Sequence, residues 1–190
     1  MGERDWDGKR HGIGTVFSDD GSLIYHGEMR EDFIHGKGIM YYQDGSNYEG
    51  NFKNGAQHGK GTFKWVNGDE YTGDWKGDLR HGRGTMNWIN GDEYIGEWWS
   101  DRMDGKGTYK LPSGDMYVGD WKEDKMHGMG TYTTSRGVQI KGMWKEGDQQ
   151  GNESMQFAVG ANAEPKKKDW MITTNEVIEY PKSQVKDNWW

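Results

Sequence analysis

The chain has 190 residues, of which 31 are glycine and none is cysteine, and its hydrophobic fraction is only 32%. The lack of cysteine excludes disulfides and thiolate zinc sites, and a net charge of −7 disfavours nucleic acid and anionic lipid as bulk electrostatic partners. With 11 Trp and 10 Tyr, any core has to be built from aromatic rings rather than aliphatic side chains. The sequence shows no secretory leader and no run of about 18 apolar residues, so a cytoplasmic protein is expected.

The first residues form an incomplete unit of a pattern that becomes regular further along the chain. Asp7 to Thr15 reads DGKRHGIGT, the second half of a unit whose first half is missing. We therefore expect residues 1–24 to be a partial N-terminal capping repeat, because terminal units of repeat arrays are atypical.

A tyrosine followed two residues later by glycine then recurs every 23 residues. The copies begin at Tyr25, Tyr48, Tyr71, Tyr94 and Tyr117. The clearest unit covers residues 71–93 and reads YTGDWKGDLRHGRGTMNWINGDE. A fixed period of this length predicts a repeat array over residues 25–151, and arrays usually present a binding surface rather than a catalytic pocket.

Alternation within a unit predicts two short strands joined by a tight turn. Tyr71, Gly73 and Trp75 share one face of the first strand, and polar residues occupy the other. Residues 82–88 alternate in the same way, and Gly, Asn and Asp mark the turns. The sequence therefore predicts an all-β fold, an elongated single-layer antiparallel meander of hairpins with an irregular C-terminal tail.

Glycine inside a strand packs nothing, so the glycine columns need cover. A ring from a neighbouring strand can lie over the bare backbone, as in the aromatic rescue of glycine in sheets. Columns of Tyr and Trp over columns of Gly would then give the sheet one ring-covered face. The opposite face carries Thr, Lys, Arg, Asp and Glu and should be exposed to solvent.

The repeat ends near Gly151, and residues 152–190 are expected to be a tail. Residues 152–168 are expected to be loop-like, and short strands are expected at 170–174 and 177–180. The apolar end of this tail favours docking on the array or on a partner.

Residues 7–151 resemble the MORN repeat (membrane occupation and recognition nexus), whose motif is close to YEGEWKNGKRHGKGTYTYADG. The resemblance is carried by the Tyr-x-Gly-x-aromatic strand and the His-Gly-x-Gly-Thr strand, which occur together in several copies. It implies the single-sheet hairpin array. In layout the chain is most similar to small, repeat-only members such as those of ciliary radial-spoke heads, which implies a cilium or flagellum axoneme, or the cytoskeleton, as its location.

Two polar columns could suggest chemistry. One repeat position carries His11, His35, His58, His81 and His127, with Asp104 in the same column. Neighbouring copies would lie roughly 10 Å apart, too far to share a metal ion, so we expect these side chains to satisfy backbone groups. A second column carries Glu28, Asp74, Glu97 and Asp120, interrupted by Asn51, and is expected to form cross-strand charge pairs. No catalytic, cofactor or metal site is expected, and the chain is not expected to be an enzyme.

The ring-covered face is the predicted partner-binding site, since Trp and Tyr are favoured contact anchors. The alternative is that the rings only shield glycine, or that the chain's own tail covers them. The predicted protein-binding residues are Tyr48, Trp75, Trp88, Tyr94, Trp98, Tyr109, Tyr117, Trp121, Trp189 and Trp190.

Three functions remain open at this point. The first is a non-catalytic scaffold subunit of a ciliary or cytoskeletal assembly, which binds protein partners through its aromatic face, edges and tail. The second is an adaptor tethered to a membrane through phosphoinositides, which the acidic balance disfavours. The third is a regulatory subunit of an enzyme on another chain. Self-association through the sheet edges is also open.

Overall fold

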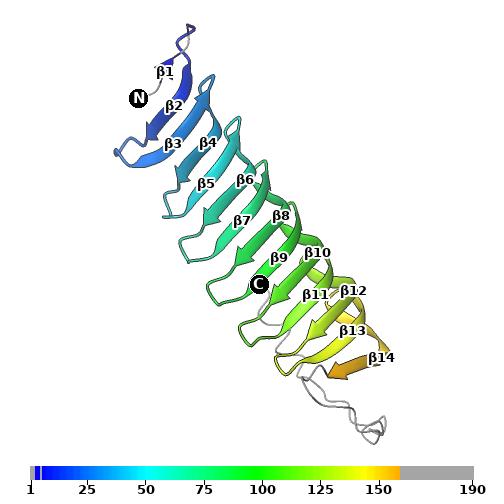
Figure 1. The fold of residues 1–190 in the computed structure, drawn as a ribbon. Helices are drawn as coiled ribbons and strands as arrows, with labels where there is room; N and C mark the ends of the chain where they lie inside the picture. The colour runs from blue at the N-terminus through cyan, green and yellow to red at the C-terminus, as the bar shows by residue number, and fades with distance from the viewer. Residues whose placement is uncertain (1–2, 5, 159–190) are drawn as a thin grey trace, which may run out of the picture. The chain divides into compact units, whose positions relative to one another are not determined.

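The computed structural model describes residues 3–4 and 6–158, and all strands in this part of the chain form one 14-stranded antiparallel sheet. Each strand is hydrogen-bonded to its neighbours in the sequence without a crossover, and Figure 1 shows the strands side by side in chain order. The predicted all-β antiparallel meander is confirmed. The strands are β1 (Glu3–Arg4), β2 (Arg10–Phe17), β3 (Leu23–Arg30), β4 (Phe33–Tyr41), β5 (Asn47–Lys53), β6 (Ala56–Lys64), β7 (Glu70–Lys76), β8 (Leu79–Asn87), β9 (Glu93–Trp99), β10 (Arg102–Lys110), β11 (Met116–Lys122), β12 (Lys125–Thr133), β13 (Val138–Lys145) and β14 (Asp148–Ala158).

The two ends of the sheet differ from the expectation. The missing opening strand of the first unit is represented by the two-residue β1, which pairs with Arg10 and His11. At the other end, β14 continues past Gly151 to Ala158, where a loop was expected, because the pairing with β13 extends to Val138. The tail strands expected at 170–174 and 177–180 lie outside the described residues.

Tight two-residue turns join the two strands of a hairpin. Gly77 and Asp78 both have positive φ, 57° and 66°, as a two-residue type I′ hairpin requires. Successive turns of this kind are tied together, since the Asp78 N–H donates to the carbonyl of Gln57 at 3.2 Å and the Asp101 N–H to that of Arg80 at 3.0 Å. Each hairpin is therefore fixed to the one before it at the turn as well as along the strands.

The second strand of a hairpin bulges at its His-Gly step on β4, β6, β8 and β12, and at Asp104-Gly105 on β10. On β8, Gly73 faces Gly84 but Asp74 faces His81, so Gly82 and Arg83 are extra residues. Gly82 has a φ of +61°, a conformation that glycine adopts without strain. A bulge of this kind bends a strand locally.

The rings cover the glycines as predicted. A Cβ atom on Gly84 would lie 2.3 Å from the Tyr71 hydroxyl oxygen, so the phenol occupies the space above that backbone. The same hydroxyl donates to the carbonyl of Asp74 at 3.0 Å. Trp75 then packs edge-on against Tyr71 and against Tyr48 of the preceding repeat, with ring centroids 5.1 Å and 5.3 Å apart. The core is thus a continuous chain of interlocked rings.

Candidate interaction surface

The predicted binding rings lie in the interior of the fold. Their exposed fractions are 0% for Tyr48 and Tyr94, 2% for Tyr117, 3% for Trp98 and Trp121, and 5% for Trp75 and Tyr109, while Trp88 is half-buried. The prediction that these aromatic rings form an exposed face is therefore wrong for the buried ones. Each Trp is wedged between the tyrosines of two repeats, as Trp98 is between Tyr71 and Tyr94 at 5.3 Å and 5.1 Å. Partner binding by this set stays a prediction, and Trp189 and Trp190 lie outside the described residues.

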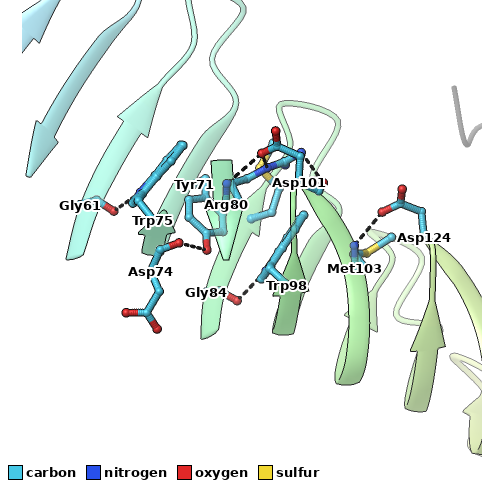
Figure 2. Close-up of polar contacts among 11 residues, drawn as sticks. Gly61, Tyr71, Asp74, Trp75, Arg80, Gly84, Trp98, Asp101, Met103 and Asp124 are labelled. Carbon is cyan, nitrogen blue, oxygen red and sulfur yellow. Dashed lines mark hydrogen bonds and ion pairs between the residues drawn. The ribbon is translucent and has the colours of Figure 1, made fainter. Parts of the chain in front are cut away.

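The hydrogen-bonding ends of these rings are also engaged within the sheet. Figure 2 shows the indole N–H groups of Trp75 and Trp98 donating to the carbonyls of Gly61 and Gly84, at 3.1 Å and 3.3 Å. Burial also raises the pKa of Tyr71 well above the ordinary value of a phenol. The ring-covered face therefore resembles a hydrophobic core in both its packing and its polar contacts.

Arg80 is the one described guanidinium with its charge placed over these rings. It lies 4.4 Å from the centroid of Trp98, and its side chain is only 20% exposed. Its backbone N–H and its Nε–H both donate to Asp101 Oδ1, at 2.9 Å and 3.1 Å, and its terminal N–H donates to the Asp101 carbonyl at 2.8 Å (Figure 2). A cation over a ring and a paired carboxylate stabilise the junction of two repeats together.

The acidic column closes the bulges and pairs with bases across the strands. Asp74 Oδ2 accepts the N–H of bulge residue Arg83 at 3.0 Å, and its Oδ1 lies 2.8 Å from Lys60 Nζ. Partial burial of Asp74 acts to raise its pKa, but the Lys60 contact and the Arg83 N–H outweigh this and lower it. Asp120 has a lowered pKa chiefly because Lys106 bonds to it at 2.7 Å. The predicted charge pairing is confirmed at these positions.

Two members of the histidine column contact the backbone of the next turn. His35 Nδ1 accepts the N–H of Asn54 at 3.5 Å. Asp104, which replaces histidine in this column, accepts the N–H of Glu123 at 3.4 Å. The predicted structural role is therefore seen at His35 and at Asp104. Among the described residues, no group of three or more His, Asp or Glu side chains is placed to hold a metal ion.

The opposite face of the sheet is open. A hollow of about 1450 Å³ extends across it from Ile13 on β2 to Gly119 on β11. Its floor includes a row of side chains that meet across the strands, and the register pairs Thr62 with Thr72 and Thr85 with Ile95. Beside this row lies a row of ion pairs that includes Lys60–Asp74 and Lys106–Asp120.

Three exposed apolar residues on this face were missed by the sequence reasoning. Trp99 is 62% exposed, Met129 60% and Met143 52%. The missed signal was a departure from the repeat, since most other copies of these positions carry charged side chains, with Ile13 and Asn51 as exceptions. A column-by-column reading of the repeats could have found them.

The family model described as "MORN repeat" matches residues 6–23, 25–47, 48–70, 71–93, 94–116 and 117–138. No curated protein matches the sequence. Among solved structures, the chain is similar to the TCP domain of SAS-4 (dCPAP) of Drosophila melanogaster, solved in complex with a proline-rich motif of Ana2 (dSTIL). The identity is 13% and the TM-score 0.42, covering 69% of this chain and 77% of that one. Within the described residues, no helix is long and apolar enough to span a membrane.

Proposed function

The chain belongs to the MORN-repeat family, and from this premise we propose that it is a non-catalytic scaffold subunit that binds a protein partner on the open face of its sheet. The hollow over β2–β11 carries this proposal, because it offers one continuous surface built from the same positions of successive repeats. The ring-covered face, in contrast, is occupied by the fold's own packing.

A ciliary or cytoskeletal assembly is the proposed setting. The described part of the chain is almost entirely repeat, a layout similar to that of the repeat-only members of the family in cilia and the cytoskeleton. This step is an analogy from architecture. The absence of a catalytic role is supported by the engagement of candidate groups, since Asp74 and His35 both accept backbone N–H groups.

The membrane-adaptor function is weaker on this surface. Phosphoinositide recognition needs basic side chains that are available to phosphate. Lys60 and Lys106 on the open face are held by Asp74 and Asp120 at 2.8 Å and 2.7 Å. Lys76 and Lys122, which make no ion pair within the described residues, are too few to form the basic cluster that membrane attachment usually needs. We therefore rank a protein partner above a lipid partner.

Site-specific photo-crosslinking in ciliated cells tests the proposal. A photoreactive residue at position 108 would lie in the hollow on β10, and a matched control at position 66 would lie on an exposed loop, where Val66 is 66% exposed. We expect position 108 to capture axonemal or cytoskeletal proteins and position 66 to capture far less. Capture from position 66 alone, or of lipid rather than protein from position 108, would reject the proposed function.

A further inference from the structure

Trp99 departs from its repeat position. In the other hairpins the last residue of the first strand is basic, and these residues are Arg30, Lys53, Lys76, Lys122 and Lys145. Trp99 is 62% exposed, and its ring centroid lies 4.5 Å from that of His81. An exposed indole has a large desolvation gain still available, and burial behind a partner would realise it.

Met129 and Met143 form a second departure. They face each other across β12 and β13. In the three preceding repeats this cross-strand pair is an ion pair, formed by Lys60–Asp74, Arg83–Glu97 and Lys106–Asp120 at 2.8 Å, 3.8 Å and 2.7 Å. Replacing a solvated ion pair with two exposed thioethers leaves an apolar, adaptable contact surface.

The two departures lie in the same half of the open face. Ile95 on β9 and Val118 on β11 line the hollow, and each is 44% exposed. Over β4–β8, the described large apolar residues that are exposed, Phe33, Tyr41 and Leu79, stand at strand ends. Apart from Ile13 on β2, which is 64% exposed, mid-strand apolar exposure in the described residues is concentrated on β9–β13.

We infer that the open face of β9–β13 binds an acidic protein segment whose apolar side chains contact Trp99 and the Met129–Met143 pair. This inference rests on the proposed function and names the partner's chemistry. Lys76 and Lys122 occupy the position of Trp99 in the adjacent repeats, and neither makes an ion pair within the described residues. Carboxylates beside the apolar side chains of the segment would complement these two lysines.

Two other occupants fit less well. A planar bilayer cannot reach Ile95 and Val118, because they line a hollow rather than a projecting tip. A second copy using the same face would present the same Lys76 and Lys122, since a two-fold interface pairs a surface with itself, while its carboxylates Asp74 and Asp120 are already paired with Lys60 and Lys106. An acidic segment avoids both problems.

Selection of binding peptides tests the inference on the full-length chain. A displayed library of random 16-residue peptides would be selected on the wild-type protein, and the enriched peptides would be synthesised and titrated. We expect them to be acidic with several apolar residues. We also expect Trp99→Lys, and separately Met129→Lys with Met143→Asp, to weaken binding at least about tenfold, as loss of a contact hot spot does.

These substitutions restore side chains that the same positions hold in other repeats, so they preserve the fold. A matched control, Val66→Lys with Ile89→Asp, places the same two charges on exposed turns outside the hollow, where the side chains are 66% and 70% exposed. This control should change affinity by less than about twofold. Circular dichroism and the melting temperature would verify folding of each variant.

Several results would overturn the inference. These are a library without binders, enriched peptides that are basic, or affinity that Trp99→Lys and the methionine variant leave unchanged. Tighter binding of the wild type than of Trp99→Lys to vesicles of phosphatidylcholine and phosphatidylserine would assign the surface to a membrane. A wild-type dimer that Trp99→Lys dissociates in sedimentation would assign it to a second copy. Crosslinking from position 108 that survives both variants would leave the proposed function standing and reject only this site.

Discussion

Trp98 and Trp99 are adjacent in the sequence and occupy opposite faces of β9. Trp98 is 3% exposed and packs between Tyr71 and Tyr94, whereas Trp99 is 62% exposed and has its closest ring contact with His81. The first repeats a position that holds an aromatic or Met in every hairpin, and the second replaces a base. Residues that follow the repeat therefore build this sheet, whereas residues that depart from the repeat are ones that the fold does not need.

The interior face should therefore be intolerant of change. Trp98→Ala removes a ring from between two tyrosines and an N–H bond to Gly84, and should lower the free energy of unfolding by about 3–5 kcal/mol. Urea denaturation followed by circular dichroism measures this loss. A cost below about 1 kcal/mol would show that the ring chain is not the core.

Alkaline pH should destabilise the same face, because its buried tyrosines would have to ionise. Burial raises the pKa of Tyr25 and of Tyr117 from 10.0 to about 12. Because the pKa in the folded state is above that in the unfolded state, the stabilisation is fully present below pH 10 and is lost as the pH rises from about 10 to 12. The urea midpoint should fall steeply over this window, with tyrosinate absorbance rising at the unfolding transition. A midpoint that stays constant to pH 12 would contradict the burial of these hydroxyls.

The junctions between hairpins should show a smaller, graded effect. Asp101→Ala removes the carboxylate that pairs with Arg80, whose guanidinium lies over the rings. It should lower the free energy of unfolding by roughly 1–3 kcal/mol. Asp124→Ala at the equivalent turn removes an acceptor only from the Met103 N–H, at 2.8 Å, and should cost about 1 kcal/mol. Thermal and urea unfolding of both variants measure these costs. If Asp101→Ala and Asp124→Ala lower the free energy of unfolding equally, Arg80 adds nothing to the stability of its junction.

Much of this architecture can be predicted from the repeat itself. The alternation of rings and glycines predicted rings over glycine columns, as the phenol of Tyr71 over Gly84 shows, and the turn residues predicted the hairpins. Burial of the rings could not be read from a single unit, because Trp75 reaches Tyr48 in the preceding repeat and closes the gap that an isolated hairpin would leave open. The Arg80–Asp101 contact was missed for the same reason, since both partners belong to different repeats.

The main error was the prediction that the ring-covered face is the exposed apolar face and that the opposite face is purely polar. A single-layer sheet with a row of Trp and Tyr suggests an exposed aromatic surface, since no second layer exists to cover it. Here the rings cover one another, and the exposed apolar side chains stand on the face that the repeat marks as polar. Met129 and Met143 could have been found as exceptions within two columns of mostly charged residues.

The ion pairs of the open face should matter little for stability. Lys60→Ala breaks a pair with Asp74 whose lysine side chain is 70% exposed, and should cost about 0.5 kcal/mol or less. The cost should shrink further at 1 M salt, where exposed charges are screened. Asp74→Ala should cost more in the same urea assay, because Asp74 also accepts the Arg83 N–H within the bulge.

The smallest effect is expected at Trp99. Trp99→Lys introduces the residue that Lys76 and Lys122 supply in adjacent repeats, and it removes little buried area, so the free energy of unfolding should change by less than about 0.5 kcal/mol. Urea denaturation beside Trp98→Ala gives the direct contrast between the two faces. A loss of several kcal/mol would make Trp99 a core residue and remove the reason to treat it as a contact site. A neutral result, joined to weakened binding, would separate the residues that hold this sheet together from those that serve its partner.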